Sequence, residues 1–196
     1  CFGQPLKRVN AWVQADQQTH GDIVITHYGL ESGVVYKLGR ELRNLNKQNQ
    51  RLKLHLDLLP DVSLQQLQQK LQGNKKQSLT NLWRKAGLDT VKINLLREIV
   101  DKRFWSDAKQ MAQQIKQLAI DLDGFRPIEE AISCAGGVKQ EALSAQLQLQ
   151  SNPHVFCCGE MLDWDAPTGG YLLTACFATG RAAGQGVHEF LKSSSA

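Results

Sequence analysis

The sequence lacks the features that mark membrane, secreted and zinc-binding proteins. No apolar run approaches the ~20 residues that a membrane-spanning helix needs, and no signal-peptide pattern opens the chain. The five cysteines are an odd number, and none has the spacing of a zinc site or of a Cys-x-x-Cys redox pair. We therefore expect reduced thiols in a cytoplasmic protein that has no metal site and is not a disulfide reductase.

A glycine-rich dinucleotide-binding turn is also missing. Such a turn has the pattern G-x-G-x-x-G and joins a strand to the start of a helix, where backbone N–H groups hold a pyrophosphate. The glycines with the nearest spacing, Gly180, Gly184 and Gly186, lie at the end of a predicted helix instead of its start. This chain alone is therefore not expected to hold a dinucleotide by its pyrophosphate.

The composition is that of an ordinary globular protein, but the charge is unevenly distributed. The 196 residues are 42% hydrophobic and 21% charged, which suits one large domain or two small ones. The net charge is +4, yet residues 37–110 contain 16 Lys or Arg against 7 Asp or Glu, a net of +9, which leaves −5 for the rest. A basic middle and an acidic C-terminal part suggest two modules with different surfaces.

The first 58 residues predict a β-rich domain. Apolar and polar residues alternate over 2–15, and a second strand over 23–26 indicates a hairpin with a long loop. Apolar residues at helical spacing follow from Val34 to Leu45. The clearest strand covers 51–58, where four leucines alternate with Lys, His and Asp. These leucines are Leu52, Leu54, Leu56 and Leu58.

The pattern changes from strands to short helices at Pro60. Ser63 is a good N-cap for the first helix, and two more helices follow before residue 105. Alternation returns at 118–122, and 127–133 is predicted as a further strand that ends at a Gly-Gly turn. Strands that resume after helices indicate a helical insert within a β-rich domain.

The C-terminal third predicts a strand, an acidic loop and a helix. Val155 to Cys158 is an apolar run typical of a buried strand. After the loop, Thr168-Gly-Gly170 opens a helix of small and apolar residues, which is predicted to be buried against a sheet. A loop carboxylate can accept from sugar hydroxyls, and N–H groups at a helix start can face an electron-rich atom. A cofactor site is one interpretation, and a βα unit with a solvated acidic loop is the other.

Four segments contain motifs that occur in a fixed order along the chain. They are Gly3-Gln-Pro-Leu-Lys7, Thr26-His-Tyr-Gly29, Ala135-Gly-Gly-Val138, and Gly159-Glu-Met-Leu-Asp163 followed by Pro167-Thr-Gly-Gly-Tyr171. In these motifs the sequence resembles the YhiN/BaiN-type NAD(P)/FAD-dependent oxidoreductases. It departs from that family because the N-terminal G-x-G-x-x-G half is missing and the chain does not begin with Met. It therefore resembles the C-terminal part of a larger flavoprotein.

The resemblance implies an α+β fold with a β-rich, barrel-like middle domain. That domain would comprise residues 1–58 and 106–134, interrupted by a small helical insert at 59–105. Residues 135–196 would form a C-terminal βα segment of a discontinuous FAD-binding domain. The N-terminal dinucleotide-binding half would then be a partner of this chain, which by itself is expected to bind no FAD and to be inactive.

The resemblance also implies how the C-terminal motif would contact FAD. Glu160, which follows Gly159, is expected to accept from ribityl hydroxyls, and Asp163 belongs to the same motif. The structural alternatives are a surface acid at Glu160 and a turn-capping role for Asp163.

Two pairs of glycines are expected to approach the flavin ring. Gly136 and Gly137 would let the backbone come close to the isoalloxazine, unless they only permit a plain turn. The second pair opens a helix whose positive end would point at the pyrimidine edge of the flavin, although two glycines can also simply permit a tight turn. The residues at this helix start are Gly169, Gly170, Tyr171 and Leu172.

The activity implied by the resemblance is hydride transfer from NAD(P)H through FAD to an unsaturated small-molecule acceptor. The sequence identifies no catalytic acid or base. His27 and Tyr28 follow a strand and precede a Gly-containing turn, where they could face the substrate side of the flavin. A structural role at the strand end is the alternative.

A nucleic-acid-binding module is the alternative function. The basic residues of the insert lie on predicted short helices, and relatives in the wider family are associated with reducing uridine in RNA, so the insert could position an RNA substrate. An ordinary solvated surface is the usual meaning of scattered Lys and Arg. The residues concerned are Lys75, Lys76, Arg84, Lys85, Lys92, Arg97, Lys102 and Arg103.

Overall fold

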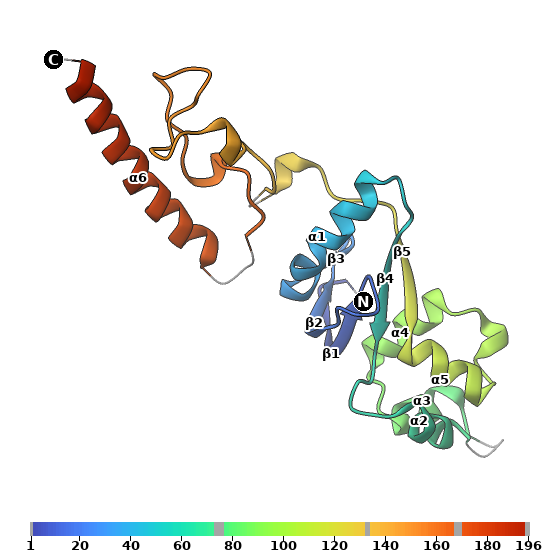
Figure 1. Cartoon of the computed structure of the whole chain (residues 1–196). Coiled ribbons are helices and arrows are strands. Elements are labelled where there is room, and N and C mark those ends of the chain that lie inside the picture. The colour runs from blue at the N-terminus through green and yellow to red at the C-terminus, as the bar shows by residue number, and fades with distance from the viewer. Residues whose placement is uncertain (1, 73–76, 132–133, 167–169, 195–196) are drawn as a thin grey trace. The chain divides into compact units, whose positions relative to one another are not determined.

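The computed structural model describes residues 2–72, 77–131, 134–166 and 170–194. The chain divides into two compact units, residues 1–125 and 126–196. The first unit is coloured from blue to yellow in Figure 1, and the second continues to red. The finer domain boundaries expected from the sequence stay a prediction.

The first unit is built on a five-stranded antiparallel sheet in the order β3-β2-β1-β4-β5. The strands are β1 (Gln4–Trp12), β2 (Thr19–Ile25), β3 (Leu30–Glu31), β4 (Leu52–Asp57) and β5 (Leu118–Leu122). Strand β4 pairs with β1 on one side and β5 on the other, so that Leu56 lies opposite Ala11 of β1 and Leu118 of β5. The mixture of this sheet with helices confirms the predicted α+β class.

The alternation in β4 determines which side chains are buried. All four predicted leucines are at most 5% exposed, which confirms the expectation from the period of two. The opposite face holds His55, whose ring stacks on Trp12 with centroids 5.7 Å apart. Burial lowers the pKa of His55, and the nearby charge of Lys53 lowers it further.

Short polar side chains begin the helices of the first unit. Ser32 accepts hydrogen bonds from two N–H groups at the start of α1 (Gly33–Lys47), which packs against β2. Ser63 caps α2 through a reciprocal capping box with Gln66, as predicted from its position. The further helices are α2 (Leu64–Leu71), α3 (Leu79–Ala86), α4 (Thr90–Ile99), the 3-10 helix η1 (Lys102–Phe104) and α5 (Ala108–Lys116).

Helices α2 to α5 gather at one end of the sheet (Figure 1). Their inward faces continue the core of the sheet: Trp83 of α3, Leu96 of α4 and Ile115 of α5 are at most 1% exposed. Gly87 ends α3 with φ 115°, a left-handed conformation that glycine adopts without strain. The predicted helical insert is therefore packed on the sheet through one shared core.

A buried ion pair fixes the segment where the chain leaves the sheet for this insert. Asp57 is 8% exposed, accepts from the N–H of Leu59 at 3.0 Å and pairs with Lys116 at 2.6 Å. The Lys116 ammonium also donates to the carbonyls of Leu59 at 2.9 Å and Val62 at 2.8 Å. All three ammonium protons thus have an acceptor, and the last residue of α5 is bound to the first residues of the insert.

The second unit has little regular structure apart from one long helix. Its elements are the 3-10 helices η2 (Ile128–Glu130), η3 (Gln140–Ala142) and η4 (Gly159–Met161) and the helix α6 (Tyr171–Ser194). The loops between them are joined by isolated β-bridges, such as the one between Gln148 and Phe156.

Two strands predicted in this unit are absent from its described residues. The described part of 127–133 contains the 3-10 turn η2, and Arg126 and Glu130 form an ion pair of 2.6 Å across it. Residues 132 and 133 lie outside the described ranges. The run 155–158 is irregular: it makes a single bridge at Phe156, and Val155 is 38% exposed.

Helix α6 forms where the sequence predicts a helix, but it is not buried. It packs through Ala183 and Gly186, which are its buried residues. Four large apolar or aromatic side chains on it are 56–71% exposed. They are Tyr171, Leu173, Phe177 and Leu191. The predicted burial against a sheet is therefore wrong for this unit, whose described residues form no sheet.

No helix among the described residues combines the length and the apolar character needed to cross a membrane.

Replacing Lys116 with Met should lower the free energy of unfolding by roughly 3 kcal/mol, because Asp57 would stay buried without its counter-ion. Lys53→Met is the matched control, since Lys53 pairs with Asp121 at 3.3 Å on the surface and exposed pairs typically contribute ~0–1 kcal/mol. Urea unfolding followed by circular dichroism measures both variants. Equal losses in the two would contradict the structural role of Lys116.

Candidate functional site

Two segments that the sequence singles out, the Gly136-Gly137 turn and the 159–163 loop, lie side by side in the second unit. Three backbone hydrogen bonds join them. The N–H of Val138 donates to the Met161 carbonyl at 2.7 Å, and the N–H of Asp163 donates to the Val138 carbonyl at 2.9 Å. The N–H of Gly136 donates to the Trp164 carbonyl at 3.2 Å. The structure thus brings together motifs that are more than twenty residues apart in the sequence.

The two glycines of the turn differ in their surroundings. A Cβ on Gly137 would lie 2.7 Å from the Leu162 carbonyl, which no real side chain tolerates. At Gly136 a Cβ would meet nothing within 4 Å, although φ of 101° still favours glycine there. Gly137 is therefore required by the contact between the two loops, while the space beside Gly136 is not filled by the described residues.

Glu160 lies in η4, which packs against α6. Gly159 anchors this turn, because its N–H donates to the Thr179 hydroxyl of α6 at 3.1 Å. Gly159 has φ of 66°, and a Cβ there would be 3.7 Å from the Cys176 sulfur. The side chains of Glu160 and Asp163 are both exposed. The loop that bears the exposed Glu160 carboxylate is thus held against α6 by its backbone.

Thr179 is a positioning residue that sequence inspection missed. Its hydroxyl accepts from Gly159 and donates to the Ala175 carbonyl at 2.7 Å, so it links the loop to the helix. The available signal was a polar residue in an otherwise small and apolar helix face. Such a residue commonly bonds to its own helix, so the pattern did not indicate a loop contact.

The helix start predicted at residues 169–172 is described from Gly170 onward, and Gly169 lies outside the described residues. Gly170 has φ of 88°, and its carbonyl accepts from both the N–H and the hydroxyl of Thr174 at 3.0 Å. Tyr171 is exposed and Leu172 is half-buried. The N-terminal turn of α6 is therefore well formed, and the positive end of a 24-residue helix lies in the same unit as Glu160.

His27 and Tyr28 belong to the first unit, in the turn between β2 and β3. The N–H of Thr26 donates to the Gly29 carbonyl at 2.8 Å and closes this turn. His27 stacks on Phe2 with ring centroids 4.3 Å apart, and Tyr28 is 68% exposed. These contacts account for a structural role of His27, and a role toward a substrate stays a prediction.

The basic residues predicted on the insert do not share one environment. Lys75 and Lys76 lie outside the described residues, and Arg84 and Lys85 are exposed on α3. Arg97 donates to the Thr80 hydroxyl at 2.6 Å, and Arg103 pairs with Asp101 at 3.3 Å. The ring of Trp105 lies about 6 Å from the charged groups of Arg97 and Lys102.

The sequence pattern placed Lys92 among the basic residues of a surface, and this prediction is wrong. Lys92 is 6% exposed and does not belong to a solvated face. Among the described residues, no three His, Cys, Asp or Glu side chains form a metal-binding group.

Comparison with known proteins decides the family. Residues 1–133 match the family described as the HI0933-like protein barrel and H2TH domain. The chain belongs to this family. It is also 24% identical over 184 residues to a 3-dehydro-bile acid delta(4,6)-reductase of Clostridium scindens, a match that covers 86% of the chain. Both findings confirm the resemblance to YhiN/BaiN-type oxidoreductases. The chain spans only 44% of the length of that reductase.

The C-terminal residues of this HI0933-like chain fit the polar edge of a flavin nucleotide. The exposed carboxylate of Glu160 suits a sugar hydroxyl, and the N-terminal turn of α6 suits an electron-rich ring edge. The indole Nε1 of Trp164, next to Gly136, is buried and has no hydrogen-bond partner among the described residues.

Gly137→Ala should separate the two loops, because the added methyl group would overlap the backbone at Leu162. Gly136→Ala is the matched control: its φ of 101° is also unfavourable for alanine, but the methyl group has open space. We expect the added methyl group to lower the free energy of opening this contact by more than ~1.4 kcal/mol, which is a factor of ten. Amide hydrogen exchange at Val138 and Asp163 should therefore accelerate at least tenfold more in Gly137→Ala than in the control. Equal exchange in both variants would show that the contact is unimportant.

Proposed function

We propose that this chain is part of an FAD-dependent oxidoreductase that passes hydride from NAD(P)H through the flavin to an unsaturated acceptor. The observation that supports it is the juxtaposition of the Gly136 turn, the Glu160 loop and α6 in one unit. Membership of the HI0933-like family and similarity to a reductase support the same class. The dinucleotide-binding half with its G-x-G-x-x-G turn would be the partner of this chain in the intact enzyme.

When bound, FAD would supply the hydride chemistry, and the residues of this chain would position it. Glu160 would accept hydrogen bonds from ribityl hydroxyls, with Gly159 and Thr179 fixing the loop against α6. The N-terminal turn of α6, at Gly170 and Tyr171, would favour negative charge at the pyrimidine edge. Gly136 would allow close approach of its backbone to the ring because no neighbouring atom of the chain fills that space.

The acceptor is proposed only as a class. The reductase of Clostridium scindens is named for a 3-dehydro-bile acid, and by analogy an unsaturated small molecule would suit this enzyme. RNA is the second candidate, and the observation that favours it is the exposed pair Arg84 and Lys85 on α3. Binding of single-stranded RNA that weakens steeply with salt would support this candidate, and no binding at low salt would exclude it.

Removing the Glu160 carboxylate from the intact enzyme should weaken FAD binding by about ten- to a hundredfold. Hydrogen bonds to charged groups typically contribute ~1.5–3 kcal/mol, and ~1.4 kcal/mol is a factor of ten. Glu160→Gln retains one acceptor oxygen and should therefore lose less affinity than Glu160→Ala. Quenching of flavin fluorescence gives the dissociation constant, and flavin retained after gel filtration gives an independent readout.

Glu141→Ala is the matched control, because Glu141 is also an exposed glutamate in a 3-10 helix of the same unit. Its FAD affinity should equal that of the wild type, and all three variants should show the wild-type circular dichroism spectrum. If Glu160→Ala binds FAD as tightly as Glu141→Ala, the role assigned to Glu160 is wrong.

A further inference from the structure

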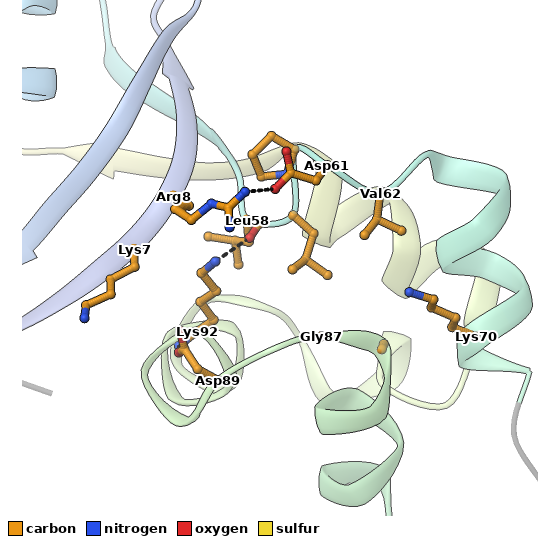
Figure 2. Close-up of a pocket in the computed structure, with 12 residues that line it drawn as sticks. Lys7, Arg8, Leu58, Asp61, Val62, Lys70, Gly87, Asp89 and Lys92 are labelled. Carbon is orange, nitrogen blue, oxygen red and sulfur yellow. Dashed lines mark hydrogen bonds and ion pairs between the residues drawn. The ribbon is translucent and has the colours of Figure 1, made fainter.

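A cleft of about 360 Å³ lies in the first unit where the sheet meets the helical insert (Figure 2). The wall from the sheet includes Arg8 of β1 and the segment from Leu58 to Asp61. The wall from the insert includes Asp89 and Lys92 of the α4 start. Figure 2 shows the side chains of Arg8 and Lys92 directed toward the same point beside the Leu58 carbonyl, while Lys7 points away from it.

Lys92 is a buried cation whose donors are incompletely used. Its ammonium donates to the Leu58 carbonyl at 2.7 Å, the one acceptor it has among the described residues. Lys116, in contrast, has three acceptors for its three protons. Two Lys92 protons are therefore left for another acceptor. Burying an ammonium with a single neutral partner costs several kcal/mol, so the fold maintains this arrangement against a substantial penalty.

The carboxylates near Lys92 are bound to other groups. Asp57 pairs with Lys116, and Asp61 pairs with Arg8 at 2.7 Å. Asp89 accepts from the backbone N–H of Lys92 as the N-cap of α4. Asp22, finally, accepts from the backbone N–H of Arg8 at 2.8 Å. None of the four forms an ion pair with the Lys92 ammonium among the described residues. Burial lowers the pKa of Lys92, with Asp89 opposing and Arg8 adding to the shift.

Arg8 is held in an unusual backbone conformation that directs it to this cleft. The pairing of β1 with β2 is interrupted between Leu6 and Val9, and Arg8 within this bulge has φ of 51°. A left-handed conformation in a non-glycine residue costs roughly 1–3 kcal/mol, and such strain is concentrated at functional sites. One edge of the guanidinium binds Asp61. The guanidinium fork has five N–H donors, so others can bind a second anion.

We propose that this cleft is a phosphate-binding site, in which the Lys92 ammonium and the Arg8 guanidinium hold one phosphate group. Phosphate matches both donors, because guanidinium binds its oxygens in a fork and ammonium adds a point charge. The phosphate can belong to a free nucleotide or to an RNA backbone. The site stands independently of the flavin, since all its residues lie in the first unit.

Isothermal titration with inorganic phosphate at constant ionic strength, balanced with chloride, tests the site directly. The wild-type chain should bind one phosphate. Lys92→Met should weaken the affinity by about ten- to a hundredfold, because a charge-assisted hydrogen bond to a desolvated group is lost. Lys109→Met is the matched control, since Lys109 is exposed on α5 and does not line the cleft; its affinity should be unchanged.

Arg8→Gln keeps the test decisive if Lys92→Met does not fold, because the Arg8 side chain is 72% exposed and its removal leaves the core intact. It should also weaken phosphate binding about tenfold or more. Fluorescence polarisation with labelled AMP and with a labelled single-stranded RNA then distinguishes the two sources of the phosphate. Failure of phosphate, AMP and RNA to bind, or equal binding by the wild type, Lys92→Met and Arg8→Gln, would overturn the proposal.

Discussion

Two ammonium groups fix the junction between the sheet and the helical insert, because they bind backbone carbonyls of residues 58–62. Lys116 is the last residue of α5 and lies just before β5, yet its side chain reaches back to the segment that leaves β4. Lys116 therefore holds together the segment in which the chain leaves the sheet after β4 and the segment in which it re-enters the sheet before β5. Lys92 adds a second link from α4 to the Leu58 carbonyl. Apolar contacts alone would stabilise this junction without fixing its geometry, because the hydrophobic effect is not directional.

The sheet was predictable because its signals are local. Four alternating leucines leave one way to bury β4, and Ser63 with Gln66 forms a capping box that can be recognised from sequence alone. The second unit was less predictable, because the apolar residues of 127–131 and 155–158 have no strand to pair with among the described residues of this unit. In the first of these, an ion pair between Arg126 and Glu130 favours a helical turn. An apolar run in one segment does not show whether a neighbouring strand is available to pair with it.

The sequence motifs name residues for a candidate flavin site, but they do not give the contacts among those residues. The motifs indicate Gly137 and Glu160. They do not show that Gly137 packs directly against the backbone of residues 161–162, which leaves no room for a side chain. They also give no sign of Thr179, whose hydroxyl fixes the loop. Lys92 is the converse case: its position among basic residues predicted a solvated side chain, and only the packing of α4 against the segment after β4 buries it. Tertiary contacts decide such cases, and composition does not show them.

Helix α6 connects the fold to the proposed activity. Gly180 and Gly184 have no neighbouring atom within 4 Å of a Cβ position, and each glycine costs a helix about 1 kcal/mol relative to alanine. Among the described residues of this unit no side chain packs against these glycines, and Leu173 and Phe177 on the same helix are exposed. Small residues beside large apolar ones are what a helix needs to pack closely on a sheet. In the enzyme that we propose, the sheet of the dinucleotide-binding half would bury this face, and the N-terminal turn of α6 would then be fixed relative to the flavin. Such a partner would explain why the side chains of α6 that were predicted to be buried are exposed in this unit.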